Sequence, residues 1–259
     1  MSDLAAAAVQ LRSMHQRGDP LVLVNAWDVA SAQRVVAAGG RAVGTSSVAV
    51  AASLGLPDAP SAPVGPIFEL LGRIARAVEV PVTADLLDGY NLDPTELVER
   101  LLAAGVVGCN LEDSDHARRG GLLDPGKVAE RLAAVRSAGA QAGVDIVINA
   151  RIDAYLHQGP GATPEVIDRA RRYLDAGADC VYPVRLVDPP VVRDLVKLLD
   201  APVNVNVGSE ISVADLAAAG ASRISIGPMA FQSALAAFDK VAARLLPTEA
   251  KRRREARLR

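Results

Sequence analysis

The polar residues that could carry out chemistry lie at the ends of short apolar runs. Carboxylates end two of these runs, at Asp85 with Asp88 and at Glu112 with Asp113. Other runs end in hydroxyl, amide or guanidinium groups: Asn25, Thr45, Ser46, Ser47, Arg151, Asn204 and Asn206. Carboxylate oxygens are ligands for hard divalent cations, and an arginine can pair with a carboxylate through two parallel hydrogen bonds. The pattern indicates a site for a metal ion and a small anionic substrate.

Oxygen ligands favour Mg²⁺ or Mn²⁺ over zinc. His15, His116 and His157 lie away from the expected strand ends, and no His/Cys pair has zinc spacing. The alternative is that the polar side chains satisfy one another as an ion-pair network without a ligand. Cys109 and Cys180 lie within apolar runs, which predicts buried free thiols in a reducing cytoplasm.

These groups must be positioned by strands that alternate with helices. The predicted strands span 21–25, 42–46, 82–85, 107–112, 145–151, 179–182, 203–207 and 223–226. Helix starts are marked by Asp93-Pro94, Asp124-Pro125, Thr163-Pro164 and Asp188-Pro189. A long Pro/Gly/Ala loop is expected at 51–66.

Eight βα units predict an α/β fold, a (β/α)₈ TIM barrel. A doubly wound sheet is the alternative, but the turn after the first strand lacks the glycines of a phosphate-binding loop. We expect one domain over 1–259, with an N-terminal helix, a C-terminal helix and a basic tail at 251–259. The tail is interpreted as a solvated terminus, with an anion-binding arm as the alternative.

Composition and charge limit the partners. The chain has 28 Lys plus Arg and 30 Asp plus Glu, which gives no electrostatic case for nucleic acid or an anionic membrane. No signal peptide or membrane span is recognised, so we expect a cytoplasmic protein. Lysines occur only in helical or tail segments, which disfavours a Schiff-base aldolase.

Six stretches, read in order, resemble the isocitrate lyase/phosphoenolpyruvate mutase superfamily over residues 21–236. They are NAWDVASA at 25–32, VGTSSVAVAASLGLPD at 43–58, PVTADLLDGYN at 81–91, GCNLEDSD at 108–115, INARIDAYL at 148–156 and PVNVN at 202–206. Activities in that superfamily include carbon–carbon lyases, phosphorus–carbon mutases and hydrolases, and oxaloacetate decarboxylation. The resemblance implies a pyruvate-like enolate held on Mg²⁺ or Mn²⁺.

The resemblance also implies roles for individual residues. The implied metal site comprises Asp85, Glu112 and Asp88. The implied substrate-binding residues are Trp27, Thr45, Ser46, Ser47, Arg151, Asn204 and Asn206. The implied catalytic residues are Asp58, near the metal waters, Glu112, and Arg151, which would pair with a substrate carboxylate or phosphonate.

Three features depart from the family pattern. Leu87 stands where a second acid is usual, which should weaken metal binding unless Asp88 compensates. The loop SDHARRGGLLDPGK at 114–127 lacks the cysteine of the lyase branch, and VYPVRL at 181–186 lacks the histidine of the mutase. These differences disfavour isocitrate lyase, methylisocitrate lyase and phosphonomutase activities.

Three functions are consistent with these residues and with the resemblance. The first is a Mg²⁺-dependent lyase or decarboxylase acting on a small 2-oxo or 2-hydroxy carboxylic acid through an enolate. The second is phosphorus–carbon chemistry, in which Arg118 and Arg119 could bind a phosphonate, although the preferred interpretation of these two residues is an ordinary solvated loop. The third is a non-catalytic relative that binds a metabolite.

The end of the chain predicts assembly. Residues 228–246 form a helical pattern with a broad apolar stripe that carries two of the three phenylalanines. By resemblance to relatives that exchange their last helix, we expect a homotetramer or dimer with this helix at the interface. The alternative is a monomer whose last helix covers its own first strand.

Overall fold

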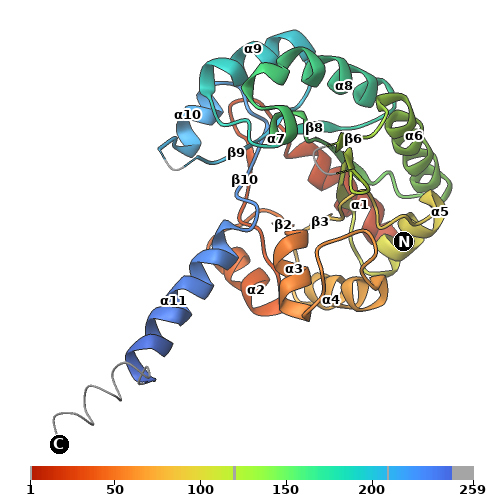
Figure 1. The fold of residues 1–259 in the computed structure, drawn as a ribbon. Coiled ribbons are helices and arrows are strands. Elements are labelled where there is room, and N and C mark those ends of the chain that lie inside the picture. Colours follow the sequence, from red (N-terminus) through yellow and green to blue (C-terminus); the bar gives the residue numbers. More distant parts are fainter. Residues whose placement is uncertain (1, 119–120, 209, 247–259) are drawn as a thin grey trace, which may run out of the picture.

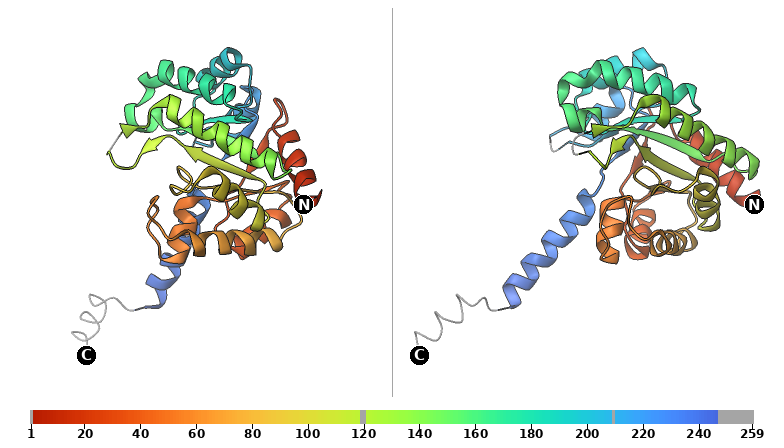
Figure 2. Two further views of the ribbon diagram at one scale, coloured as in Figure 1. Left: turned by 90° about the vertical axis from the view of Figure 1, so that its right-hand side faces the viewer. Right: turned by 45° about the vertical axis from the view of Figure 1, so that its right-hand side comes forward.

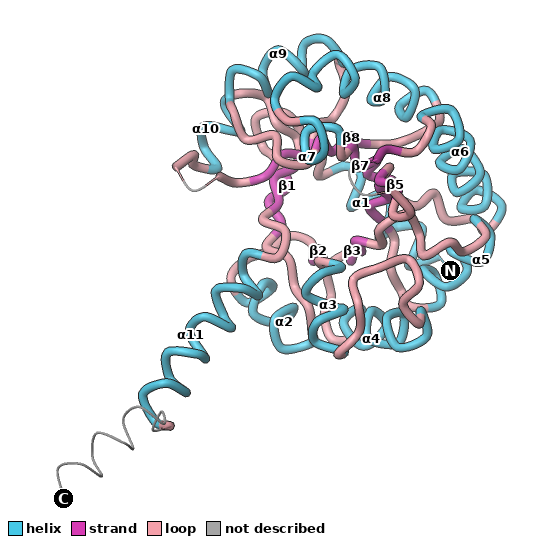
Figure 3. Tube along the Cα trace, in the orientation of Figure 1, coloured by secondary structure: helices cyan, strands magenta, loops and turns pink. Residues whose placement is uncertain are grey.

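The computed structural model describes residues 2–118, 121–208 and 210–246. In these residues, eight parallel strands form a closed ring surrounded by helices (Figures 1 and 3). Two ladders, β1-β10-β9 and β2-β3-β4-β7-β8, meet through the bridges Ala26–Thr45 and Val181–Val203. The strand order around the ring is that of a (β/α)₈ barrel, so the predicted fold is confirmed.

Each predicted strand is present, and most are shorter than the apolar run that predicted them. The barrel strands are β1 Leu21–Leu23, β2 Val43–Gly44, β3 Val82–Asp85, β4 Gly108–Glu112, β7 Val147–Ile152, β8 Cys180–Pro183, β9 Asn204–Asn206 and β10 Arg223–Ser225. A small antiparallel hairpin, β5 Ser114–Asp115 with β6 Gly121–Leu122, lies in the loop after β4. Cys109 and Cys180 are buried and free, as predicted.

Helices surround the ring and connect consecutive strands. They are α1 Ser2–Ser13, α2 Val29–Ala37, α3 Ser47–Leu54, α4 Val64–Arg76, α5 Pro94–Ala103, α6 Pro125–Gln141, α7 Ala154–Gln158, η1 Pro160–Ala162, α8 Thr163–Asp175, α9 Pro189–Leu199, α10 Val213–Ala218 and α11 Met229–Leu245. Asp93 and Asp124 cap α5 and α6 by accepting backbone hydrogen bonds in the first turn.

Two local predictions were wrong. The segment 51–66 is not a continuous loop, because α3 ends at Leu54 and α4 begins at Val64. The alanine-rich stretch before Gly55 continues the helix that starts at Ser47, and Gly55 ends it in the left-handed conformation. Thr163 is the first residue of α8 rather than its cap, because the preceding turn η1 already leads into the helix.

Polar side chains inside the barrel support its upper rim. Oδ1 of Asn110 accepts hydrogen bonds from Nη2 of Arg223 at 3.0 Å and from Nδ2 of Asn149 at 2.9 Å. Because both donors occupy this oxygen, the amide nitrogen of Asn110 must point the other way, toward Asp85. The barrel interior therefore fixes the orientation of a group at the strand ends.

The two terminal helices differ in how closely they pack against the barrel. On α1, Arg12 bonds to Asp179 and to the backbone oxygens of Asp145 and Ile146, just before β7 and β8 begin, so this helix covers the barrel's lower end. By contrast, α11 projects away from the barrel and has no buried residue (Figures 1 and 2). Across the described residues, no helix combines the length and apolarity needed to span a membrane.

Candidate active site

A cavity of about 480 Å³ opens at the carboxyl ends of the barrel strands. It is lined by residues at the ends of all eight barrel strands or in the loops that follow them, including Ser46, Ser47, Asp85, Asn110, Arg151, Tyr182, Arg185, Asn206 and Ser225. We call it the mouth cavity. In parallel barrels this end is where side chains from different strands converge, so residues as far apart in sequence as Asn25 and Met229 line one cavity.

Asp85 is held by groups from two neighbouring elements. Its Oδ2 accepts hydrogen bonds from the backbone nitrogen of Ser47 at 3.2 Å and from its hydroxyl at 3.0 Å. Its Oδ1 accepts one from Nδ2 of Asn110 at 3.2 Å, and Thr45 accepts from the Asp85 backbone. These hydrogen bonds fix the orientation of the carboxylate and the directions in which its remaining lone pairs point.

Asp58 comes from the loop before α4 and approaches the same serine. Burial raises the pKa of Asp58, the negative charge of Asp85 raises it further, and a hydrogen bond from Ser47 opposes this rise. Asp58 lines a second cavity of about 340 Å³, which also contains Glu112 and Arg151. We call this the side cavity. The structure thus brings Asp58 close to Asp85 and Glu112, two residues of the implied metal site.

Glu112 and Arg151 form a buried ion pair with His116. Nη1 of Arg151 lies 2.7 Å from Oε2 of Glu112, and Nε2 of His116 lies 2.7 Å from Oε1. Burial raises the pKa of Glu112, whereas the hydrogen bond from His116 and the charge of Arg151 oppose that rise. The hydrogen bond to Glu112 in turn raises the pKa of His116, which favours the protonated imidazole.

Arg151 is also bound by Asp153. Its Nε and Nη2 donate to the two carboxylate oxygens of Asp153 at 2.7 and 3.0 Å. Ser114 donates to Asp153 at 2.6 Å and is itself 2.8 Å from Nε2 of His157. Arg151 and Glu112 of the predicted site therefore belong to an ion-pair network of protein side chains, which was the alternative interpretation of these polar residues.

Asp88 and Leu87 line other cavities than Asp85 does. Asp88 lines a third cavity with Glu112 and Arg131, and its buried Oδ1 has no hydrogen-bond partner. Leu87 is buried, has a left-handed backbone (φ 53°) and lines the side cavity with Asp58 and Glu112. Leu87, where the resemblance implied a second acid, therefore lines the same cavity as two carboxylates.

The remaining predicted residues occupy three different depths. Asn206 lines the mouth cavity and bonds to the hydroxyl of Tyr182, whereas Asn204 lies one layer below it and is fully buried. Thr45 is buried beside Asp85. Trp27 does not line the mouth cavity; it packs edge-on against Phe231 of α11, with ring centroids 5.3 Å apart.

The donor chemistry at the mouth fits a hard cation. Burial is the main cause of the raised pKa of Asp58 and the negative charge of Asp85 adds to it, so a cation bound between these carboxylates would relieve their repulsion. Among the described residues no three His, Cys, Asp or Glu side chains converge as a complete metal cage. Mg²⁺ usually takes only one or two carboxylates and keeps several waters, so this arrangement suits it.

Sequence reasoning missed two histidines. His116 and His157 were set aside because neither follows a barrel strand directly, yet both line the side cavity. His116 belongs to the loop after β4, four residues after Glu112, and the hairpin β5–β6 folds that loop back over the barrel. Its position four residues after Glu112, in the loop that follows that strand end, was the available signal. Arg119 lies outside the described residues.

Comparisons with known proteins identify similar sequences and structures. The sequence model of the phosphoenolpyruvate phosphomutase family matches residues 11–246. The chain is 33% identical to an uncharacterised protein of Mycobacterium tuberculosis H37Rv over 88% of this chain and 85% of that protein. It is 27% identical to 2-methylisocitrate lyase of Escherichia coli K12, over 76% and 68% of the two chains. The structure of a candidate phosphonomutase from Burkholderia cenocepacia J2315 is similar, with a TM-score of 0.87, 37% identity, and coverage of 93% and 99%.

Proposed function

Because this chain belongs to the phosphoenolpyruvate phosphomutase family, within the isocitrate lyase/phosphoenolpyruvate mutase superfamily of lyases and mutases, we propose that it is a Mg²⁺-dependent carbon–carbon lyase or decarboxylase. Its substrate is a small 2-oxo or 2-hydroxy carboxylic acid that reacts through an enolate. The observation that carries this proposal is the carboxylate of Asp85, which Ser47 and Asn110 fix at the mouth cavity and whose charge acts on Asp58 of the side cavity.

The chain's own residues would divide the work. Asp85 and Asp58 would hold Mg²⁺ or Mn²⁺, directly or through water, with Glu112 nearby. When bound, the ion would polarise the substrate's 2-oxygen and carboxylate and favour negative charge on the enolate. Ser46 precedes α3 and its hydroxyl makes no capping hydrogen bond, so this hydroxyl could bind the substrate carboxylate at the helix start, whereas Ser47 already donates its hydroxyl and backbone N–H to Asp85. Asn206 would close the opposite side of the cavity.

Arg151 would act differently from the simple anion anchor expected from the resemblance. Glu112 and Asp153 already occupy its guanidinium, so it contributes a fixed positive charge to the cavity wall and aligns Glu112. His116 is the candidate proton donor or acceptor in the loop that lacks the lyase cysteine, because its ring faces the side cavity and is hydrogen-bonded to Glu112.

Phosphorus–carbon chemistry is the second candidate. The similar Burkholderia structure favours it, and Arg118 lines the side cavity beside His116 and His157, where a phosphonate would find positive charge. A non-catalytic metabolite-binding role is the third candidate, and the buried Leu87 at the acid position favours it.

Binding of oxalate, an unreactive enolate mimic, tests the proposal. Calorimetry should show oxalate binding to the protein with Mg²⁺ and none after chelation by EDTA. Asp85→Ala should abolish that binding, whereas the exposed control Asp194→Ala should retain it. Absence of Mg²⁺-dependent oxalate binding to the unaltered protein would refute both enzymatic proposals. Stronger thermal stabilisation by phosphonopyruvate than by oxaloacetate or malate would favour the second candidate.

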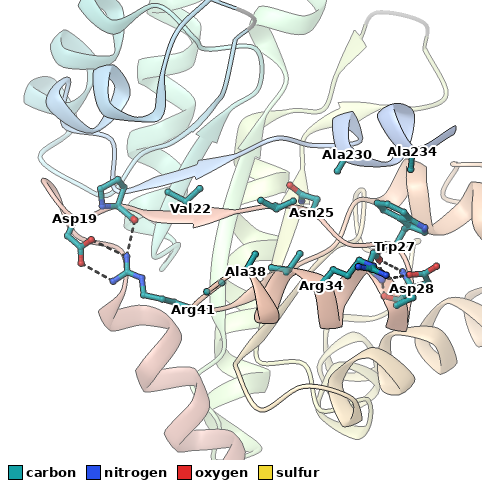
Figure 4. A pocket seen from close by; sticks show the side chains of 17 residues that line it. Asp19, Val22, Asn25, Trp27, Asp28, Arg34, Ala38, Arg41, Ala230 and Ala234 are labelled. Atoms are coloured by element: carbon teal, nitrogen blue, oxygen red, sulfur yellow. Dashed lines mark hydrogen bonds and ion pairs between the residues drawn. The ribbon is translucent and has the colours of Figure 1, made fainter. Parts of the chain in front are cut away.

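We further propose that the protein is a homo-oligomer in which α11 packs against another copy. A groove of about 880 Å³ runs between β1, α2 and the start of α11 (Figure 4). Its floor is the outer face of β1, where Val22 and Val24 remain 37% and 41% exposed. Strands of a parallel barrel are normally covered on that face by a helix, so in a single copy the outer face of β1 lacks its covering helix.

The projecting helix has the complementary apolar surface. Leu235, Phe238, Val241 and Leu245 are all exposed, and Phe238 is 68% exposed. These residues recur at helical spacing along one stripe, which a second copy's groove could bury. Exchange of α11 between copies would therefore cover both apolar surfaces at once.

A further inference from the structure

We infer that Arg185 binds a second, distal carboxylate of the substrate and that an adjoining apolar cavity accepts a substituent next to it. The inference rests on the proposed function and names the substrate class more closely: a dicarboxylic acid with an alkyl substituent. Arg185 lies in the loop between β8 and α9, on the carboxyl side of the barrel.

Arg185 stands where two cavities meet. It lines the mouth cavity together with Val187, and the same two residues line a further cavity of about 440 Å³. The rest of that cavity is formed by Tyr155, Gly159, Pro160, Thr163, Leu186, Asp188 and Val191. Its walls are largely apolar, so it suits an alkyl group rather than a second charge.

The charge of Arg185 is available to a ligand. Its side chain is exposed, and no acid among the described residues lies within ion-pair distance of it. Arg151, the other guanidinium on the mouth cavity, is already bound by two carboxylates. An anionic group that enters the mouth cavity on the side away from the proposed metal site can therefore pair with Arg185, whose positive charge no acid among the described residues neutralises.

The backbone of Arg185 is held in place by the site itself. Its φ is 68°, a left-handed conformation that a glycine would adopt with less strain. Its N–H donates to Oδ1 of Asn206 at 3.1 Å, and the Asn206 N–H donates to the carbonyl of Leu186 at 3.2 Å. Arg185 is therefore anchored to a residue that lines the mouth cavity, despite an unfavourable backbone conformation.

Binding of two unreactive or slowly reacting probes in the presence of Mg²⁺ tests this inference. Oxalate has no distal carboxylate, whereas malate has one. Arg185→Gln should weaken malate binding about tenfold or more and leave the Kd of oxalate unchanged, as measured by calorimetry. The matched control is Arg193→Gln, which removes an exposed arginine of α9 that lines neither cavity. It should alter neither Kd.

The apolar cavity is tested separately with 3-propylmalate. Val191→Phe should narrow the cavity, weaken binding of the alkylated acid severalfold and leave malate binding unchanged. Equal malate affinity in Arg185→Gln and the unaltered protein, with oxalate still bound, would overturn the inference and leave the proposed function standing. If the unaltered protein binds oxalate with Mg²⁺ but not malate, the inference is also overturned. Failure of the unaltered protein to bind oxalate with Mg²⁺ would instead refute the proposed function.

Discussion

Arg151 and Glu112 are direct partners on adjacent parallel strands, and Nη1 of Arg151 lies 2.7 Å from Oε2 of Glu112. The same guanidinium makes a two-point contact with Asp153. One arginine therefore neutralises two buried carboxylates at the point where β4 and β7 end. The planar fork of arginine is needed for this, because a lysine ammonium cannot face both acids through parallel bonds.

Arg151→Lys should therefore destabilise the fold as well as weaken ligand binding. We expect a loss of about 2–4 kcal/mol in the free energy of unfolding, on the scale of breaking a buried charge pair. Urea unfolding at pH 7 measures it. The control Arg172→Lys alters an exposed i,i+4 pair with Asp168 and should leave stability nearly unchanged, because solvent screens exposed ion pairs. Equal stability of the two variants would show that the buried network contributes little.

Leu87→Glu should make stability depend on metal. The new carboxylate would face Asp58 and Glu112, so like-charge repulsion and burial should lower the Tm in EDTA. Mg²⁺ should restore the Tm and bind more tightly than to the unaltered protein. Leu87→Gln, which adds the same bulk without charge, should show no such gain. An unchanged Mg²⁺ affinity in Leu87→Glu would mean that the side chain does not reach the ion.

His15 should make the fold less stable in mild acid. Burial is the main cause that lowers the pKa of His15 from 6.5 to about 4, and its Nδ1 bonds to the carbonyl of Leu11. Below pH 6.5 the unfolded chain takes up a proton that the folded protein binds only near pH 4, so stability falls as pH falls through that window. The loss should approach roughly 3 kcal/mol, since each unit corresponds to about 1.4 kcal/mol.

Urea unfolding of the protein and of His15→Gln at pH 7, 5.5 and 4.5 isolates this contribution, because other titrating groups are common to both. The difference in unfolding free energy between the two proteins should shift in favour of the variant as the pH falls. A difference that stays constant with pH would show that His15 titrates normally in the folded state.

The exposed stripe of α11 should control assembly. Light scattering at micromolar concentration should give a multiple of the 26.9 kDa chain mass. Phe238→Asp places a charge in the stripe and should shift the protein toward the monomer, whereas Lys240→Asp on another face of the helix should not. A monomeric mass for the unaltered protein would contradict the proposed exchange of α11.

The periodic features of the sequence were sufficient to predict the fold. Eight apolar runs separated by capped, helix-length segments specify βα units, because a parallel strand needs apolar residues on both faces and a crossover helix to return. Asp85 and Glu112 could be placed at the mouth for the same reason, since strand ends in a barrel meet at one rim. Family motifs spread along most of the chain narrowed the chemistry.

Contacts between distant segments were decided only by the tertiary structure. No local pattern shows that Arg223 fixes Asn110, that Asp153 competes for Arg151, or that His116 folds back onto Glu112. Loop conformations set these contacts, and loops follow no period from which side-chain direction can be read. The position of α11 likewise could not be predicted from its amphipathic stripe. Such a stripe can pack against the helix's own barrel or against a second copy, and the sequence does not distinguish the two.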